Sequence, residues 1–357
     1  MARYKWPMGK LLFACSLVFI IPIACSSSSP TNAAGDTSGD AGSSGTIMDP
    51  GGSGPTPAGS YTVRFGPVSV PPGTERTQCI VRRLGNPNAL HVGSIHNTLG
   101  KASHHMIVYR VNDTTEQTAP FDCKPFTDTL DPTKGSPLMI TQKKDEVLTL
   151  PVGVAYSIAP NQMLRLEMHY INPGSQAAEL TASSTFVPIA DADFQYEADF
   201  LFIGNPDIKL PPNAKTSLGP SFFQLPSEYA DAKFFAITGH EHQYGTNVTV
   251  AVAENADDLG TTVYDVPGWN WAESKTVFAS PPFTVPAGGG MRFTCEWNNT
   301  SDRTVSFGES ANDEMCFFWA YYYPSKGPRV CAHTNWTGAP LDFCCPGNLG
   351  CALLGRQ

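Results

Sequence analysis

The chain has 357 residues, of which 41% are hydrophobic and 15% are charged, with 32 glycines and 31 prolines. Such a composition supports a folded protein with many turns, and it favours β-rich architecture. The formal net charge is −9, the pI is near 5.3, and the basic residues are not clustered. Because nucleic-acid-binding proteins need a basic surface, we expect no nucleic-acid partner. The length suggests two domains of ordinary size.

The first residues have the pattern of an export signal. A basic segment precedes an apolar stretch from Leu11 to Ala24, which ends at Cys25 and a run of serines. A short apolar core with a basic flank indicates a signal and not a structural helix. Residues 22–25 (Pro-Ile-Ala-Cys) resemble a bacterial lipoprotein processing site, in which the cysteine is lipidated. We therefore expect residues 1–25 to be a lipoprotein-type signal peptide. An ordinary cleaved signal and an uncleaved anchor are the alternatives.

All three alternatives place the body of the protein outside the cytoplasm. The lipoprotein interpretation predicts an exported protein that a lipid anchors to the cell envelope, in the bacterial outer membrane or periplasm. Its partner there is the membrane itself. The following residues, 26–59, are Ser, Gly, Thr, Ala and Pro with almost nothing apolar to bury, so they predict a flexible linker.

Cysteine usage agrees with export. Apart from Cys15 and Cys25 near the N-terminus, the cysteines are Cys79, Cys123, Cys295, Cys316, Cys331, Cys344, Cys345 and Cys351. An even number of cysteines in an exported chain predicts disulfides. In the tail, adjacent Cys344 and Cys345 rarely bond each other, so two of the three pairings with Cys331 and Cys351 stay open. The alternative for this tail is a zinc knuckle that uses His333.

Short apolar or alternating runs follow the linker in chain order and are separated by Gly, Pro, Asn and Asp, a pattern typical of antiparallel sandwiches. The runs are Tyr61–Phe65, Val68–Val70, Cys79–Arg83, His105–Val111, Glu146–Leu150, Met163–Ile171, Glu179–Val187, Phe200–Ile203, Lys233–Thr238, Thr246–Val252, Lys275–Phe278, Gly290–Trp297, Arg303–Gly308 and Met315–Tyr323. We predict an all-β protein of two tandem, jelly-roll-like antiparallel β-sandwich domains. Their expected bounds are 60–193 and 194–328, and a Cys-rich tail follows at 329–357.

Residues 239–245 (Gly-His-Glu-His-Gln-Tyr-Gly) carry the clearest chemical signal. In an extended strand His240 and His242 point the same way, so both can bind one metal ion. Two imidazoles leave copper, zinc or iron unsatisfied, and Met315 is our candidate for the third ligand. A His-Glu-x-x-His zinc site is excluded, because Tyr244 stands where it needs a histidine. The alternative is a polar strand end with two solvated histidines.

Further histidines lie in the first half of the chain. His104 and His105 open one strand-like run, and His169 lies in an alternating segment. Adjacent histidines on a regular strand face opposite sides, so binding one ion with both requires a strand end or a bulge. The alternative is a hydrogen-bonded core histidine at 105 and a solvated one at 104. The remaining histidines fall in turn-rich sequence and are expected at the surface: His91, His96 and His333.

Taken together, these segments resemble one family, the copper type II, ascorbate-dependent monooxygenases, which include peptidylglycine α-hydroxylating monooxygenase and dopamine β-monooxygenase. The matching segments follow the family's order: His104-His105-Met106, Met168-His169-Tyr170, His240-Glu241-His242 with Gly245, and Glu309 through Asp313-Glu314-Met315-Cys316. The resemblance covers roughly residues 60–325, and the Asp-Glu-Met-Cys segment is its most specific part.

The resemblance implies one copper in each sandwich, so two ions per chain, facing each other across a solvent-filled cleft. The ligands of the electron-transfer copper would be His104, His105 and His169. The copper that binds and activates O₂ would be held by His240, His242 and Met315, whose soft thioether stabilises Cu(I). The resemblance also implies the disulfides Cys295–Cys316 and Cys79–Cys123.

The chain departs from the family at two positions. Thr238 stands where the peptide-hydroxylating enzyme has an arginine that anchors the substrate carboxylate, and Trp319 stands where it has a pocket tyrosine. Without the guanidinium the site loses bidentate carboxylate recognition, so we expect a substrate other than a glycine-extended peptide.

The function predicted from the sequence is a copper-dependent monooxygenase that hydroxylates a substrate C–H bond with O₂. An external two-electron donor such as ascorbate completes the reaction. A non-catalytic copper-binding envelope lipoprotein is the first alternative, and a surface binding or adhesion module is the second.

Overall fold

Strands dominate the computed structural model, which describes residues 59–124, 135–336, 338–346 and 351. The predicted signal peptide and nearly all of the predicted linker lie outside the described residues. The described residues belong to one compact unit that begins at Pro55. No described helix is long and apolar enough to cross a membrane. The helical elements are short 3₁₀ turns: η2 (Asp191–Asp193), η3 (Ser227–Tyr229) and η4 (Trp271–Glu273).

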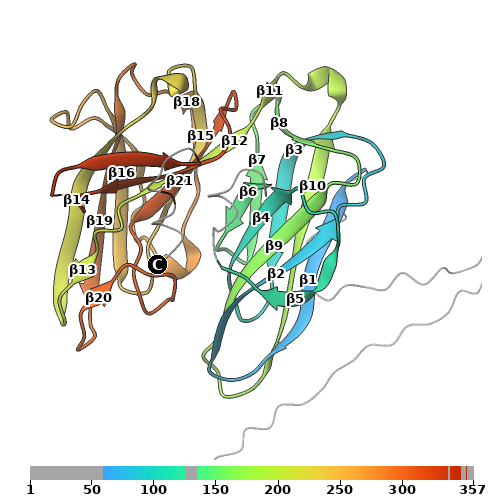
Figure 1. Cartoon of the computed structure of the whole chain (residues 1–357), viewed down its shortest axis with the longest axis horizontal. Coiled ribbons are helices and arrows are strands. Elements are labelled where there is room, and N and C mark those ends of the chain that lie inside the picture. Colours follow the sequence, from blue (N-terminus) through green and yellow to red (C-terminus); the bar gives the residue numbers. More distant parts are fainter. Residues whose placement is uncertain (1–58, 125–134, 337, 347–350, 352–357) are drawn as a thin grey trace, which may run out of the picture. The chain divides into compact units, whose positions relative to one another are not determined.

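The first half of the chain forms two sheets that pack face to face (Figure 1), and their strands pair antiparallel except for the short β11, which is parallel to β8. One sheet has the order β1 (Tyr61–Val70), β10 (Ala178–Ile189), β3 (Leu90–Leu99), β8 (Val154–Ile158) and β11 (Tyr196–Glu197), with β7 (Asp145–Thr149) also paired to β3. The other has the order β5 (Gln117–Asp122), β2 (Thr74–Arg83), β9 (Met163–Asn172), β4 (Ser103–Val111) and β6 (Gly135–Thr141). Phe65 and Ile95 of the first sheet share a buried core with Met106 and Leu166 of the second.

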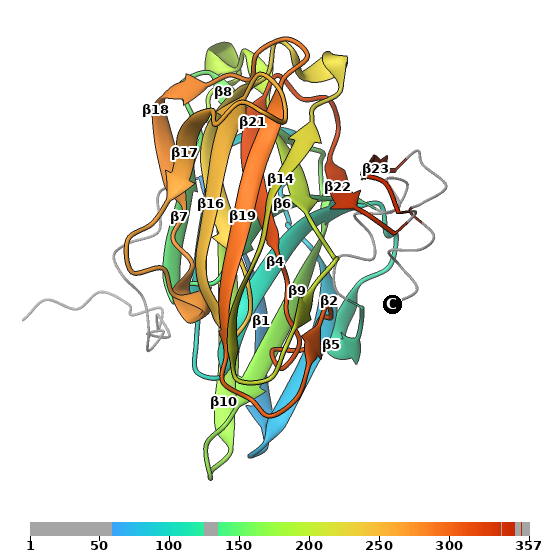
Figure 2. The ribbon, with the colours of Figure 1, turned by 90° about the vertical axis from the view of Figure 1, so that its left-hand side faces the viewer.

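The second half repeats this architecture. One sheet has the order β18 (Val277–Phe283), β15 (Lys233–His240), β21 (Phe317–Tyr323), β12 (Asp199–Gly204), β22 (Arg329–Thr334) and β23 (Leu341–Cys345). The facing sheet has the order β14 (Ala214–Gln224), β19 (Gly290–Asn299), β16 (Gly245–Ala253) and β17 (Thr261–Asp265), which Figure 2 shows side by side. A small ladder joins β13 (Lys209–Leu210) to β20 (Val305–Ser306). The predicted all-β, two-sandwich fold is confirmed.

Strand β21 is buried on both of its faces. Phe318 and Tyr322 join the core of the second sandwich, while Trp319 and Tyr321 belong to the core cluster of the first. Because successive side chains on a strand alternate sides, one aromatic strand supplies both clusters. The hydroxyl of Tyr321 accepts a hydrogen bond from the backbone N–H of Ile140 on β6, at 3.1 Å. The second sandwich therefore packs closely on the first.

Three histidines expected at the surface in turn-rich sequence lie on strands instead, although their side chains are partly exposed. His91 and His96 belong to β3, and His333 belongs to β22. Each has a partner: His91 stacks on Phe194, and carboxylates accept from the other two, Asp145 for His96 at 3.0 Å and Asp342 for His333 at 2.7 Å. Strand β3 escaped prediction because Gly93 and Asn97 interrupt its apolar pattern. Strand β20 is also shorter than the predicted run Arg303–Gly308.

The disulfides settle the pairing left open for the tail. Cys331 bonds Cys344 and Cys345 bonds Cys351, so the zinc-knuckle alternative is wrong because no thiolate among these four is left for a metal. Cys331 and Cys344 face each other directly across the β22–β23 ladder, which brings their side chains together. The predicted disulfides Cys79–Cys123 and Cys295–Cys316 are confirmed. Strand β22, which lies within the predicted tail, pairs in parallel with β12 and extends the second sandwich.

Candidate metal centres

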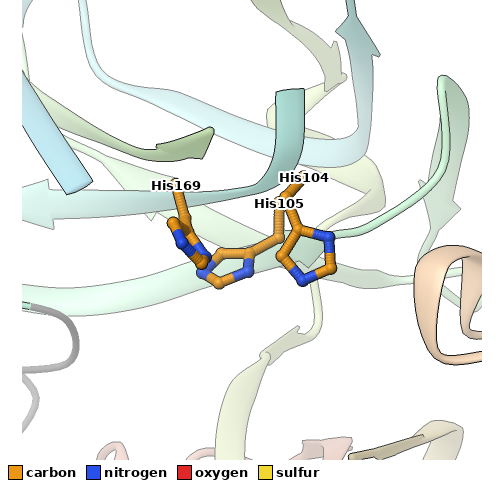
Figure 3. A group of neighbouring side chains, drawn as sticks. All are labelled: His104, His105 and His169. Atoms are coloured by element: carbon orange, nitrogen blue, oxygen red, sulfur yellow. The ribbon is translucent and has the colours of Figure 1, made fainter. Parts of the chain in front are cut away.

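A cluster of three histidines lies where β4 and β9 pair (Figure 3). His105 is directly opposite His169, and the register shifts between Ser103 and His105, which is the bulge that adjacent histidine ligands require. One ring nitrogen from each of His104, His105 and His169 lies within 4.8 Å of the others, close enough for all to bind one ion. Whether they do so stays a prediction.

The environment of this cluster suits a metal better than a solvated surface. His104, His105 and His169 are at most 7% exposed. Burial lowers the pKa of His104 to about 3 and that of His105 well below its usual value, with His169 contributing to both shifts. The imidazoles are therefore neutral and keep lone pairs for a metal. Nε2 of His104 and both ring nitrogens of His105 are buried without a hydrogen-bond partner, and a bound copper ion would satisfy one nitrogen of each ring.

Glu75 on β2 fixes the third imidazole of this cluster. Nε2 of His169 donates to Oε1 of Glu75 at 3.1 Å. This hydrogen bond is the main cause that lowers the pKa of Glu75 to about 2, so the carboxylate is ionised and can only accept. Nε2 of His169 is therefore the nitrogen that donates to the protein, and Nδ1 is the atom that could bind a metal. A carboxylate that orients a ligating imidazole in this way is common in metal sites.

The second candidate centre lies at the end of β15. His240 and His242 have ring centroids 5.1 Å apart and are each at most 4% exposed. Burial lowers the pKa of His242 to about 4 and that of His240 well below its usual value, so both rings are neutral. Nδ1 of His240 donates to Oε1 of Gln142 at 3.1 Å, and Nδ1 of His242 donates to the carbonyl of Asp313 at 3.3 Å. Both rings therefore keep Nε2 as a ligand atom.

Hydrogen bonds to the side chain of Glu314 connect the segment that carries Met315 to the segment that carries these histidines. Its buried carboxylate accepts hydrogen bonds from the backbone N–H groups of His242, Tyr244 and Met315 at 2.9, 2.7 and 3.3 Å. It also accepts from Nε1 of Trp297 at 2.9 Å. Burial raises the pKa of Glu314 to about 7 in spite of these bonds. Met315 itself is buried, and its role as a ligand stays a prediction.

The two candidate centres lie next to each other. The ring centroids of His105 and His240 are 6.3 Å apart, and the ring of Trp271 from η4 lies 5.0 Å from that of His104. Aromatic side chains such as Trp319 pack between the sandwiches at this level, and its ring lies 5.9 Å from that of His240. The structure therefore differs from the expected solvent-filled cleft, because both centres are buried in the contact between the sandwiches.

Thr238, which stands at the family's arginine position, forms hydrogen bonds within the same contact between the two sandwiches. It is buried and donates through Oγ1 to Thr276 at 2.9 Å. Oγ1 of Thr276 in turn donates to the carboxylate of Glu146 at 2.7 Å. The hydrogen bonds that start at Thr238 thus end at a carboxyl group of the first sandwich, which Nζ of Lys143 also approaches at 3.9 Å and whose pKa burial raises.

Sequence reasoning missed three side chains that contact the candidate ligands. Glu75, Gln142 and Trp271 are far from the histidines along the chain and belong to no motif. Only strand pairing and the packing of the sandwiches bring them there. The one available signal was that Glu75 lies four residues before Cys79, so that a strand extended back from the predicted run Cys79–Arg83 places both side chains on one face.

The fold and these centres define a protein of two β-sandwiches with two buried histidine clusters that fit metal ions. Residues 199–338 match the family model "Copper type II ascorbate-dependent monooxygenase, C-terminal domain". A tyramine beta-hydroxylase of Caenorhabditis briggsae is 24% identical over 195 residues, which are 51% of this chain and 32% of the relative. The chain thus spans about a third of that relative's length. These matches confirm the predicted resemblance to the copper type II ascorbate-dependent monooxygenase family, which the family model places over residues 199–338.

Solved structures give weaker likenesses. The glycosylasparaginase PNGase F from Flavobacterium meningosepticum has a TM-score of 0.31 at 10% identity, with 79% of this chain and 99% of that chain covered. Another peptide-N(4)-(N-acetyl-beta-D-glucosaminyl) asparagine amidase structure has a TM-score of 0.31 at 9% identity, with 73% of this chain and 94% of that chain covered. These scores are too low to support an inference.

Proposed function

We propose that this chain is a copper-dependent monooxygenase that hydroxylates a C–H bond of its substrate. One atom of O₂ enters the C–H bond to give an alcohol, and the other leaves as water with two protons and two electrons. The electrons come from an external donor of the ascorbate class. The observation that supports this proposal best is the combination of the family match with two adjacent groups of buried histidines.

Each cluster has its own part in the proposal. Copper held by His104, His105 and His169 would supply electron transfer, and copper held by His240, His242 and Met315 would supply the activation of O₂. The protein's contribution is to keep the imidazoles neutral, to fix their tautomers through hydrogen bonds, and to exclude bulk water. The ring separation of 6.3 Å between His105 and His240 supports direct electron transfer between the centres.

The substrate is proposed to lack a carboxylate anchor. The hydrogen-bonded series from Thr238 through Thr276 to Glu146 contains no guanidinium that could hold a substrate carboxylate in two parallel hydrogen bonds. The name of the curated relative makes phenolic amines such as tyramine the first compounds to test.

We also propose that the protein acts outside the cytoplasm as a lipoprotein anchored through Cys25. The four disulfides support an oxidising compartment. Growth with labelled palmitate tests the anchor. Wild type should incorporate the label and Cys25→Ser should not, whereas equal labelling of the two would contradict the lipoprotein proposal.

The catalytic proposal is tested with ¹⁸O₂, copper and ascorbate on a set of amines and uncharged aromatic compounds. The expected result is an alcohol that carries one labelled oxygen per O₂ consumed. His242→Ala and Met315→Leu should abolish the product, while His96→Ala, which changes a histidine on β3, should leave it unchanged. Protein that binds copper at both centres yet yields no labelled product from any compound would favour the copper-binding alternative.

A further inference from the structure

Two side chains of the first sandwich each bind an imidazole and the backbone of the second sandwich. Oε1 of Glu75 accepts from Nε2 of His169 at 3.1 Å and from the backbone N–H of Ala311 at 2.9 Å. The hydroxyl of Ser310 also donates to Glu75, at 3.3 Å. Ala311 lies four residues before Met315, on the segment that approaches the second centre.

At the second centre, Gln142 likewise forms hydrogen bonds to an imidazole and to the backbone of the second sandwich. Its Oε1 accepts from Nδ1 of His240 at 3.1 Å, and its Nε2 donates to the carbonyl of Trp271 at 3.3 Å. The bond to the Trp271 carbonyl fixes which end of the amide faces His240, because a carbonyl can only accept. Gln142 follows β6 in the first sandwich, whereas His240 and Trp271 belong to the second.

The acceptors determine the ligand atoms of both rings. His169 must carry its proton on Nε2 and His240 on Nδ1, so Nδ1 of His169 and Nε2 of His240 are left for a metal. Each acceptor has its second bond across the contact between the sandwiches. If the sandwiches separate, His240 loses the hydrogen bond to Gln142, and Glu75 loses the hydrogen bond from the backbone N–H of Ala311. Orientation of the imidazoles and docking of the sandwiches therefore depend on the same two side chains.

We propose that Glu75 and Gln142 are positioning residues that couple the tautomers of His169 and His240 to the docking of the two sandwiches. Coupling of this kind is reciprocal, so whatever strengthens docking also favours the metal-ready tautomers, and metal binding favours docking. Only the metal part of this inference rests on the proposed function. The tautomers and the docking contact are properties of the metal-free protein.

The test uses metal-free protein labelled with ¹⁵N-histidine, in which eight histidines give resolvable ring signals. Wild type should show His169 as the Nε2–H tautomer and His240 as the Nδ1–H tautomer. Glu75→Ala should mix the tautomers of His169, and hydrogen exchange at the Ala311 amide should accelerate at least tenfold. Glu75→Gln keeps an acceptor oxygen, so it should restore both the tautomer and the slow exchange.

Gln142→Ala is the corresponding test at the second centre and should mix the tautomers of His240. Asp145→Ala is the matched control, because it removes the carboxylate partner of His96, which lies in neither centre. It should change the His96 signal and leave His169, His240 and the Ala311 amide as in wild type. Unchanged tautomers in Glu75→Ala and Gln142→Ala would overturn the inference, and so would wild-type exchange at Ala311 in Glu75→Ala.

Copper titration then separates this inference from the function. Glu75→Ala should weaken copper binding at the first centre by roughly 10–100-fold, and Glu75→Gln should recover most of the loss. Tautomers that respond as expected in a protein without hydroxylase activity would leave the coupling intact and refute only the function. Full activity with unresponsive tautomers would refute only the coupling.

Discussion

Replacement of Glu314 by alanine tests how the second centre is held together. The carboxylate of Glu314 accepts from the N–H groups of His242, Tyr244 and Met315 and from the indole of Trp297. Glu314→Ala leaves these four donors without a partner in a buried site. Each unpaired buried donor costs about 1–3 kcal/mol, and water that enters the new space recovers part of the loss.

The variant also removes a carboxylate that is unfavourable when charged. Burial raises the pKa of Glu314 from 4.5 to about 7, and a tenfold change in a protonation equilibrium corresponds to about 1.4 kcal/mol. Near pH 8 this relief offsets about 3 kcal/mol of the loss. We therefore expect Glu314→Ala to lower the free energy of unfolding by on the order of 4 kcal/mol.

Glu314→Gln separates the two contributions. Its amide oxygen can replace Oε2, which has three donors, so that only the N–H of Tyr244 faces an amide NH₂. The lost bond and the relief of a buried charge are similar in size, so the change in stability near pH 8 should be about 1 kcal/mol or less. Urea unfolding at pH 8 measures all variants, and Glu116→Ala, at an exposed single acceptor, is the control. Equal losses in the alanine and glutamine variants would refute the reasoning.

The other predictions concern residues around the centres. Burial raises the pKa of Asp199 to about 6, so its contribution to stability is complete below pH 4 and is lost as the pH rises through 6. Asp199→Asn should be about 3 kcal/mol more stable than wild type at pH 8 and equal to it at pH 4 by urea unfolding; a difference independent of pH would contradict this. Gly239→Ala would bring a Cβ within 2.7 Å of the Tyr264 ring, and we expect a loss of about 1–3 kcal/mol by thermal unfolding. Replacing Cys295 and Cys316 together by alanine opens a loop of 21 residues and should cost about 3 kcal/mol, measured by urea unfolding; an unchanged midpoint would show that packing alone holds the Met315 segment.

Local patterns predicted many of the strands and the histidine pairs, but they missed several strands, among them β3, β5, β6, β8, β14 and β17. The alternation around His169 identified β9, because this feature depends only on strand periodicity. The rings of His240 and His242 do lie 5.1 Å apart, but β15 ends at His240, so the two are not on one strand face as predicted. Strand β3 was missed because Gly93 and Asn97 weaken its apolar pattern, while its stability comes from pairing with β10, β7 and β8. Such pairing is a tertiary effect that propensity does not report.

The sequence also did not predict that the two centres are buried. The family resemblance implied a solvent-filled cleft, and the aromatic run from Phe317 to Tyr323 did not show which of its faces would be covered. Glu75 and Gln142 belong to no motif, because their roles arise only when the second sandwich docks on the first. Residues that act across such a contact leave no local pattern in the chain.

Copper stoichiometry tests the central claim most directly. The protein from residue 60 onward is loaded with copper, and the number of ions per chain is compared among wild type, His169→Ala and Met315→Leu. We expect two ions in wild type, with His169→Ala weakening one of them and Met315→Leu the other. One ion or none in correctly folded, disulfide-intact protein would contradict the assignment of two copper centres.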